Sequence, residues 1–139
     1  LFAAYYFSSK EAQKQSLLVP IAAILLFLLH PVGREAFYFT AFWLIPIAAV
    51  VFFKDNLFAK SLGATFTAHA VGGVIWLYFV PTNAAFWTAL IPIVAVERFV
   101  FACGITLSFV AVNSLLALAQ NKLPQGVNVD KKYAFLTKA

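Results

Sequence analysis

Two adjacent charges and one histidine are the residues of this chain that could do chemistry inside apolar segments. Glu97 and Arg98 lie in the stretch IPIVAVERFVFACGI, and His69 lies in SLGATFTAHAVGGVIWLY. Charged groups at membrane depth are costly, so they normally face protein or a water-filled cavity. Neighbouring positions on a regular helix point about 100° apart. We therefore expect Glu97 and Arg98 to be poor partners for one another and to need other groups.

His69 is the partner that the spacing offers to Glu97. If the last apolar region enters the membrane as a helix at Ala84, Glu97 lies ~20 Å along it. His69 lies ~12 Å from the opposite end of its own segment, so the two depths nearly coincide in a ~30 Å core. A contact between them would make the imidazole a protonatable, switchable group. With Arg98, Thr67 and Asn113, these residues are expected to form a buried polar centre for a ligand, a proton or an ion.

Each of these residues also has a structural interpretation. Glu97 and Arg98 can pin helices together through carbonyl, Thr and Asn groups, or can lie at a membrane surface. His69 can be a buried histidine bonded to a backbone carbonyl. His30 and His69 are expected at different depths in the membrane, which does not suit a haem bound between them. His69 and Glu97 together are only weak evidence for a metal site, because they supply two ligands. With no nucleophile elbow, P-loop or zincin pattern, we predict no catalytic or metal-binding residue and leave cofactors unknown.

Composition indicates the class of protein that must position these groups. Hydrophobic residues make up 63% of the chain and charged residues 11%, with a mean hydropathy of +0.90. A soluble domain of 139 residues cannot hide that much apolar surface. The net charge of +5 is spread over short loops without an RNA-type motif, so it favours membrane orientation over nucleic-acid binding. We expect an all-α, polytopic membrane helix bundle whose partner is the lipid bilayer.

The apolar runs predict four full transmembrane spans. The last is too long for one straight crossing, because its helix would reach ~54 Å against a hydrocarbon core of ~30 Å. We expect it to be broken near Pro92, the charged pair or Gly104, either as a kinked helix or as a re-entrant piece plus a span. The predicted spans are residues 16–29, 37–53, 62–80 and 84–119.

Domain organisation and orientation follow from the same pattern. Residues 1–15 are expected to hold the end of an earlier span and a cytoplasmic loop, residues 16–119 the bundle, and residues 120–139 a basic cytoplasmic tail. With one net crossing in the last region, eight lysines fall on one side and Arg34 alone on the other. This asymmetry predicts a prokaryotic-type cytoplasmic membrane with the lysine-rich loops and tail inside. The lysines are Lys10, Lys14, Lys54, Lys60, Lys122, Lys131, Lys132 and Lys138.

Aromatic residues gather at the expected outer face. They are Trp43, Trp76, Trp87 and Tyr78. One interpretation is an interfacial aromatic belt, and the other is an outer vestibule that captures a small ligand. The one-sided distribution favours the vestibule, because a belt usually marks both interfaces.

Small residues repeat every four positions in the third span. Ala64, Ala68 and Gly72 are expected on one helical face, where a neighbouring backbone can come close. The surrounding stretches HPVGREAFYFTAFWLIPI and SLGATFTAHAVGGVIWLY, with IPIVAVERFVFACGI, make the chain similar over residues 31–113 to the substrate-binding (S) components of energy-coupling-factor transporters. The resemblance implies that the small face docks a coupling subunit and that a vitamin or metal ion binds near the outer side. In that family the small face usually belongs to the first span, and six spans are usual where this chain shows four.

These observations leave three hypotheses. The first is an integral membrane component that binds a small solute or ion for transport, through the buried polar centre and the outer vestibule. The second is a non-catalytic subunit of a larger membrane complex, with other membrane subunits as partners. The third is a proton-handling membrane protein that uses Glu97 and His69.

Overall fold

Every regular element in the described part of the chain is a helix. The computed structural model describes residues 10–119, 129 and 131–134, and no strand occurs among them. This confirms the all-α prediction. The chain forms two compact units, Leu1–Ala102 and Cys103–Ala139, which are described separately.

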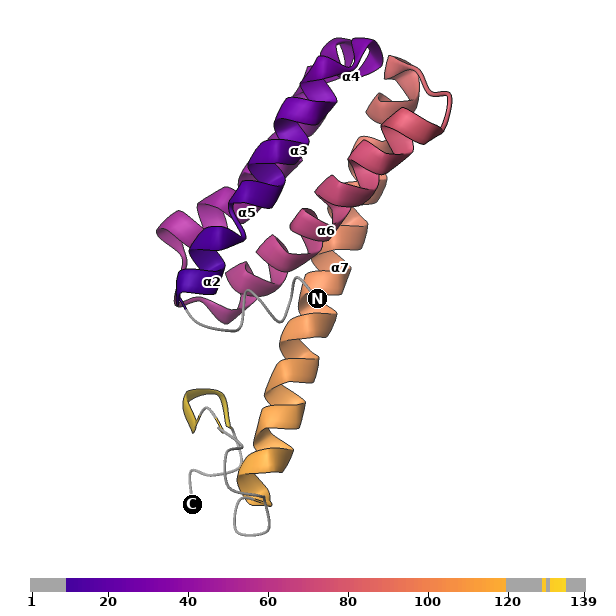
Figure 1. Cartoon of the computed structure of the whole chain (residues 1–139). Helices are drawn as coiled ribbons and strands as arrows, with labels where there is room; N and C mark the ends of the chain where they lie inside the picture. The colour runs from indigo at the N-terminus through magenta and orange to yellow at the C-terminus, as the bar shows by residue number, and fades with distance from the viewer. Residues whose placement is uncertain (1–9, 120–128, 130, 135–139) are drawn as a thin grey trace. The chain divides into compact units, whose positions relative to one another are not determined.

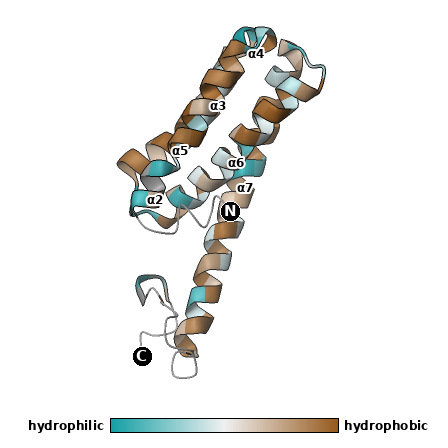
Figure 2. Cartoon of the chain, viewed as in Figure 1, coloured by the Kyte–Doolittle hydropathy of each residue, from teal (hydrophilic) through white to brown (hydrophobic). Residues whose placement is uncertain are grey.

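The first unit is built from helices that run alongside one another (Figure 1). Short α4 and the connection from α6 to α7 lie at one end, and α2 and the connection from α5 to α6 lie at the other (Figure 1). Hydrophobic residues dominate α3 and α5, whereas hydrophilic residues mark α2 and α4 (Figure 2). The elements are α2 (Lys10–Gln15), α3 (Leu18–Leu29), α4 (Pro31–Glu35), the 3₁₀ turn η1 (Phe37–Thr40), α5 (Ala41–Phe52), α6 (Leu57–Phe79) and the first part of α7 (Ala84–Leu118).

Local sequence sets the helix ends. His30 is extended, with a ψ of 137°, as expected of a residue before proline, and Pro31 then opens α4. At the start of α6, the Asn56 side chain accepts a hydrogen bond from the Ala59 amide at 2.9 Å. Asn83 accepts one from the Phe86 amide at 2.9 Å in the same way at the start of α7.

The structure refines the predicted helix boundaries. The segment HPVGREA, which lies between the first two predicted spans, contains α4, because proline is tolerated in a first helical turn. The third apolar helix begins at Leu57 rather than residue 62, because its Asn56 cap lies earlier in the chain. Of the two alternatives for the last apolar region, the structure has the single helix, α7, with Pro92 inside it.

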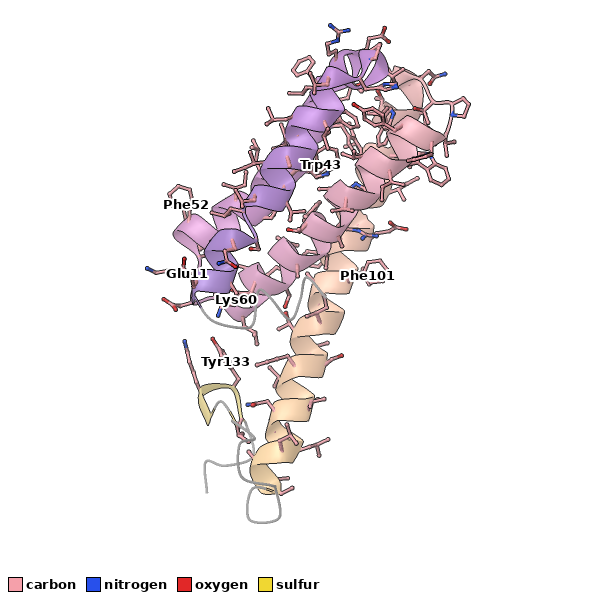
Figure 3. All side chains as sticks on the ribbon, in the orientation of Figure 1. Glu11, Trp43, Phe52, Lys60, Phe101 and Tyr133 are labelled. Carbon is pink, nitrogen blue, oxygen red and sulfur yellow. The ribbon has the colours of Figure 1, made fainter. Side chains whose placement is uncertain are left out.

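The core of the first unit is aromatic. α6 packs against both α5 and α3. The Phe27 ring meets the Trp43 and Trp87 rings edge-on, each with centroids 5.0 Å apart, and Phe39 lies 4.9 Å from Trp87. Figure 3 shows Trp43 inside the bundle, in line with its complete burial. Large rings in edge-to-face contact combine apolar burial with favourable quadrupole geometry.

Two glycines allow the backbone to approach this core. A Cβ at Gly33 would lie 1.8 Å from the Phe27 carbonyl oxygen, a distance that no side chain can occupy. A Cβ at Gly73 would lie 3.0 Å from Cζ2 of Trp43. Glycine is therefore required where α4 folds back on α3, and it favours close packing of α6 on Trp43.

Two helices of the described part are long and apolar enough to cross a membrane, namely α6 and α7. α3 and the segment 37–52 are apolar but shorter. The 12 residues of α3 rise ~18 Å, which is less than the ~30 Å core. The helix lengths thus give two candidate spans, and the predicted four full spans are not supported by them.

The second unit contains the rest of α7 and the short 3₁₀ helix η3 (Lys131–Tyr133). The Tyr133 ring lies 5.9 Å from Phe109. Ala117, Val129 and Ala134 form a small apolar cluster. The predicted span end in residues 1–9 and most of the predicted basic tail lie outside the described residues.

Candidate functional site

An open groove of about 280 Å³ lies between α6 and α7 within the first unit. Its α6 residues are spaced by three, four and seven positions, so they share one helical face. Its α7 residues come from the first two turns after the Asn83 cap. We call this feature the α6–α7 groove, and its lining residues are His69, Gly72, Gly73, Trp76, Phe86, Trp87 and Leu90.

His69 gives the α6–α7 groove its unsatisfied polar group. The side chain is half-buried, and its ring lies 5.7 Å from the Phe39 ring. Nε2 is buried and has no hydrogen-bond partner. A buried polar atom without a partner is costly and asks for an explanation, such as a ligand. The indole of Trp87, by contrast, donates a hydrogen bond to Oγ1 of Thr82 at 3.2 Å.

The two glycines of the groove have different surroundings. Gly73 meets Trp43, so its side of α6 is closed by the aromatic core. Gly72 is exposed, and a Cβ placed there meets nothing within 4 Å. The open space in the groove therefore lies beside Gly72, and a side chain at this position would occupy it without displacing the core.

The predicted aromatic vestibule is only partly assembled. Trp76 and Trp87 line the groove together with His69. Trp43 is instead completely buried and belongs to the core. Tyr78 donates a hydrogen bond to the Leu26 carbonyl at 2.9 Å, which ties α6 to α3. Whether the vestibule captures a ligand stays a prediction.

Phe86 and Leu90 are groove residues that the sequence analysis did not select. Nothing in their types suggested a site, because phenylalanine and leucine are common throughout the chain. Only their positions relative to the start of α7 could have indicated that they line a groove. Asn83 fixes the start of α7, and Leu90 then lies about one helical turn after both Phe86 and Trp87.

Glu97 and Arg98 pair with each other, which corrects the expectation that they would not. Nη2 of Arg98 donates a hydrogen bond to Oε2 of Glu97 at 3.1 Å. The Arg98 guanidinium also lies 4.7 Å from the Phe101 ring centroid. Although their Cβ atoms diverge, both side chains are long enough to bend toward one another over the helix surface. The Glu97 side chain is 52% exposed and that of Arg98 18%.

Among the described residues, no hydrogen bond joins His69 to Glu97, so the buried polar centre stays a prediction. Nε2 of His69 has no hydrogen-bond partner, while Glu97 is engaged by Arg98. Thr67 is fully buried in α6, and Asn113 is buried in the second unit. A polar contact between α6 and α7 is made instead by Thr65, whose hydroxyl donates to the Leu62 carbonyl at 3.2 Å and the Arg98 carbonyl at 3.4 Å.

The small-residue face of α6 is packed at one end only. Ala64 is buried next to Val50, whereas Ala68 and Gly72 are exposed. Within this chain, the close approach that small residues allow occurs at Gly73 and at Gly33 in α4. The exposed remainder of the face is free to meet lipid, a ligand or another chain.

A second, wholly apolar groove of about 470 Å³ runs between α3 and α6. It is lined by Leu18, Val19, Ala22, Ala23, Leu26, Val71, Val74 and Ile75.

The described residues contain no cluster of three or more His, Cys, Asp or Glu side chains that could hold a metal ion.

Comparison of the chain with protein-family models, with curated proteins and with solved structures finds no match.

Proposed function

We propose that this chain is an integral membrane protein that binds a small, largely apolar solute in the α6–α7 groove, as the binding component of a transport system. One observation carries the proposal. A groove walled by Trp76, Phe86 and Trp87 also contains an imidazole whose Nε2 is buried without a partner. Concave, mostly apolar sites with a few polar groups are the usual form of small-molecule sites.

The exterior of the chain supports placement in a membrane. Large apolar side chains such as Leu29, Phe52 and Phe79 are exposed on different helices. Figure 3 shows Phe52 pointing away from the bundle. An exposed apolar surface of this extent suits lipid better than water. In the proposed topology α3 and the segment 37–52 also cross, and their short length is accommodated by local thinning of the bilayer.

The two ends of the first unit suggest its orientation. Lys54 and Lys60 lie at the end that carries α2, and Arg34 lies in α4 at the other end. The positive-inside rule places the lysine end in the cytoplasm. The α6–α7 groove is formed by the second half of α6 and the start of α7, so it lies toward the outer face in this orientation.

The chemistry of the groove favours an organic solute over an ion. No charged side chain is among its lining residues, and Glu97 is paired with Arg98. Aromatic walls suit a planar or apolar molecule, and Nε2 of His69 suits one hydrogen-bonding group on it after a small ring rotation. The resemblance to S components, which capture small molecules near the outer side, points in the same direction.

The test fills the groove and leaves the core untouched. Gly72→Leu places a side chain in open space, and leucine is a better helix former than glycine, so folding is not expected to suffer. Gly104→Leu is the matched control, because Gly104 is also a helical glycine with nothing within 4 Å and lies outside the groove residues. Binding of indole to the full chain in lipid nanodiscs is measured by ligand-observed NMR.

We expect indole to bind the wild type and Gly104→Leu equally and to lose saturation transfer in Gly72→Leu. His69→Phe keeps the ring shape but removes the nitrogen, so it should weaken binding without abolishing it. Small molecules extracted from protein purified out of native membranes should show the same pattern. Equal indole binding by Gly72→Leu and the wild type would contradict the proposal.

The alternative is a non-catalytic subunit of a larger membrane complex. It is favoured by the apolar groove between α3 and α6 and by the exposed Ala68 and Gly72 on the small-residue face. On this hypothesis companion chains co-purify in fixed ratio and stay bound to Gly72→Ala, whereas no small molecule is recovered from the wild type.

A further inference from the structure

The outward face of α7 in the first unit carries an ion pair among apolar side chains. Ile93, Val96, Glu97, Val100 and Phe101 recur at spacings of three and four and are all exposed. Figure 3 shows the Phe101 ring projecting outward from α7. Within the described part of the chain nothing covers this face, yet it is not uniformly suited to lipid.

The ion pair lies at membrane depth if α7 is a span, as the proposed function requires. Glu97 is 13 residues after the first residue of α7, or ~20 Å by helical rise, against a core of ~30 Å. Ionised groups at this depth normally face protein. The Glu97 side chain is half-exposed, so its carboxylate can accept a further hydrogen bond besides that from Arg98. The hydrogen bond between the two side chains therefore leaves their polar capacity incompletely used.

We infer that this face of α7 is the interface of a homodimer, in which Glu97 and Arg98 of one chain pair with Arg98 and Glu97 of a second copy. The argument is charge complementarity. The face presents one negative and one positive group at adjacent positions, so a two-fold axis along the membrane normal brings each charge to its opposite. Two copies inserted in the same direction hold their ion pairs at the same depth.

The hydrogen-bonding groups of the two side chains allow this pairing between copies. An arginine has five N–H donors and can engage two carboxylates, so its own Glu97 and that of the second copy can both bind. Val96 and Val100 flank the pair and supply apolar contact at the same interface. A different protein would need its own opposed charges at this depth, whereas the second copy supplies them by symmetry.

The test is charge complementation between two differently tagged copies of the full chain. The copies are co-expressed, extracted in mild detergent and captured by one tag, and the second tag is quantified. Wild-type copies should co-purify. Glu97→Arg with itself and Arg98→Glu with itself should lose co-purification, because each puts like charges together. Glu97→Arg expressed with Arg98→Glu should regain it.

Matched controls use another adjacent pair of opposite charges, Arg34 and Glu35. Arg34→Glu and Glu35→Arg alter exposed residues of α4 in the same way and should leave co-purification unchanged. Glu97→Gln keeps the side-chain shape and should reduce co-purification, so it decides the matter if the charge reversals fail to fold. Folding is checked by circular dichroism on each variant.

Several outcomes would overturn the dimer. They are wild-type copies that do not co-purify, Glu97→Gln that pairs as well as wild type, folded reversal variants that do not rescue each other, and a stoichiometric different protein in place of the second tag. Resistance of the wild type to alkaline extraction from membranes is measured on the same samples. A chain that stays in the membrane but is monomeric contradicts only the dimer, whereas a chain that is extracted contradicts the membrane proposal itself.

Discussion

The two long helices of this protein are both apolar enough to cross a membrane, but they have different surroundings. In the most apolar 18-residue window of α6, 44% of residues are buried inside the chain, against 17% in that of α7. α6 packs against both α5 and α3, and it carries small residues that let Trp43 come close. The start of α7 contributes Trp87 and Val94 to the core, while Ile93 and Val100 face outward. Apolarity alone therefore does not tell an inner helix from an outer one.

The α6–α7 groove lies where these two kinds of helix meet. It combines core residues, such as Trp87, with exposed ones, such as Trp76 and Gly72. The outward face of α7 has only its own ion pair as a polar contact. Substitutions of core residues should therefore change mainly folding, whereas substitutions of exposed residues should change mainly binding.

The largest effect is expected at Gly33. Gly33→Ala places Cβ 1.8 Å from the Phe27 carbonyl oxygen, so α4 cannot fold back on α3 without moving the backbone. We expect a loss of at least about 4 kcal/mol in the free energy of unfolding, or failure to fold. Gly72→Ala, in open space, should instead stabilise the chain by up to about 1 kcal/mol. Denaturant titration in mixed micelles measures both, and a mild effect at Gly33 would show that α4 is not held against α3.

Trp43→Ala should have the next largest effect. Removal of a completely buried ring leaves a cavity in contact with Phe27 and Phe39, and the expected cost is about 3–5 kcal/mol. Trp76→Ala removes a half-exposed ring of the groove and should cost much less while weakening indole binding. Unfolding and binding measured on both variants test this separation. Equal destabilisation by the two would mean that the groove is part of the core.

Two tyrosine hydroxyls allow a hydrogen bond made by α6 to be compared with one made by α7. Tyr78→Phe removes the hydrogen bond to the Leu26 carbonyl and should cost about 1 kcal/mol. Tyr38→Phe removes the contact with the Thr88 hydroxyl, which keeps a second partner in the Ala84 carbonyl, so the cost should be smaller. Thermal unfolding of the two variants shows which one loses more stability. A larger loss in Tyr38→Phe than in Tyr78→Phe would contradict the prediction.

The smallest effect on folding is expected on the outward face of α7. Val100 is 59% exposed, so Val100→Ala should change the free energy of unfolding of the single chain by less than about 0.5 kcal/mol. The same substitution should lower co-purification of tagged copies, because Val100 flanks the ion pair of the inferred dimer. Dilute detergent, in which the copies separate, gives the stability of the single chain. A large loss there would show that Val100 packs within its own chain.

The helices of this protein could be predicted from local sequence, and their partners could not. The apolar runs gave the positions of the helices to within a few residues, because helix formation depends on near neighbours. The early start of α6 was missed because the Asn56 cap precedes the apolar run. Trp76 and Trp87 were selected and do line the groove, but Trp43 looked equivalent in sequence and is buried. Which face of a helix turns inward depends on segments distant in the chain.

The sequence by itself determined that the chain is apolar and helical, and that His69, Gly72 and Trp76 share one face of a helix, because the period of an α-helix is fixed by its backbone. Only the tertiary structure decided that Phe86 and Leu90 close that face into a groove and that Trp43 fills the core. It also decided that Glu97 binds Arg98 and that Nε2 of His69 has no hydrogen-bond partner among the described residues. The physical reason is that contacts between helices depend on side-chain reach and on packing between residues far apart in sequence, which local periodicity does not encode.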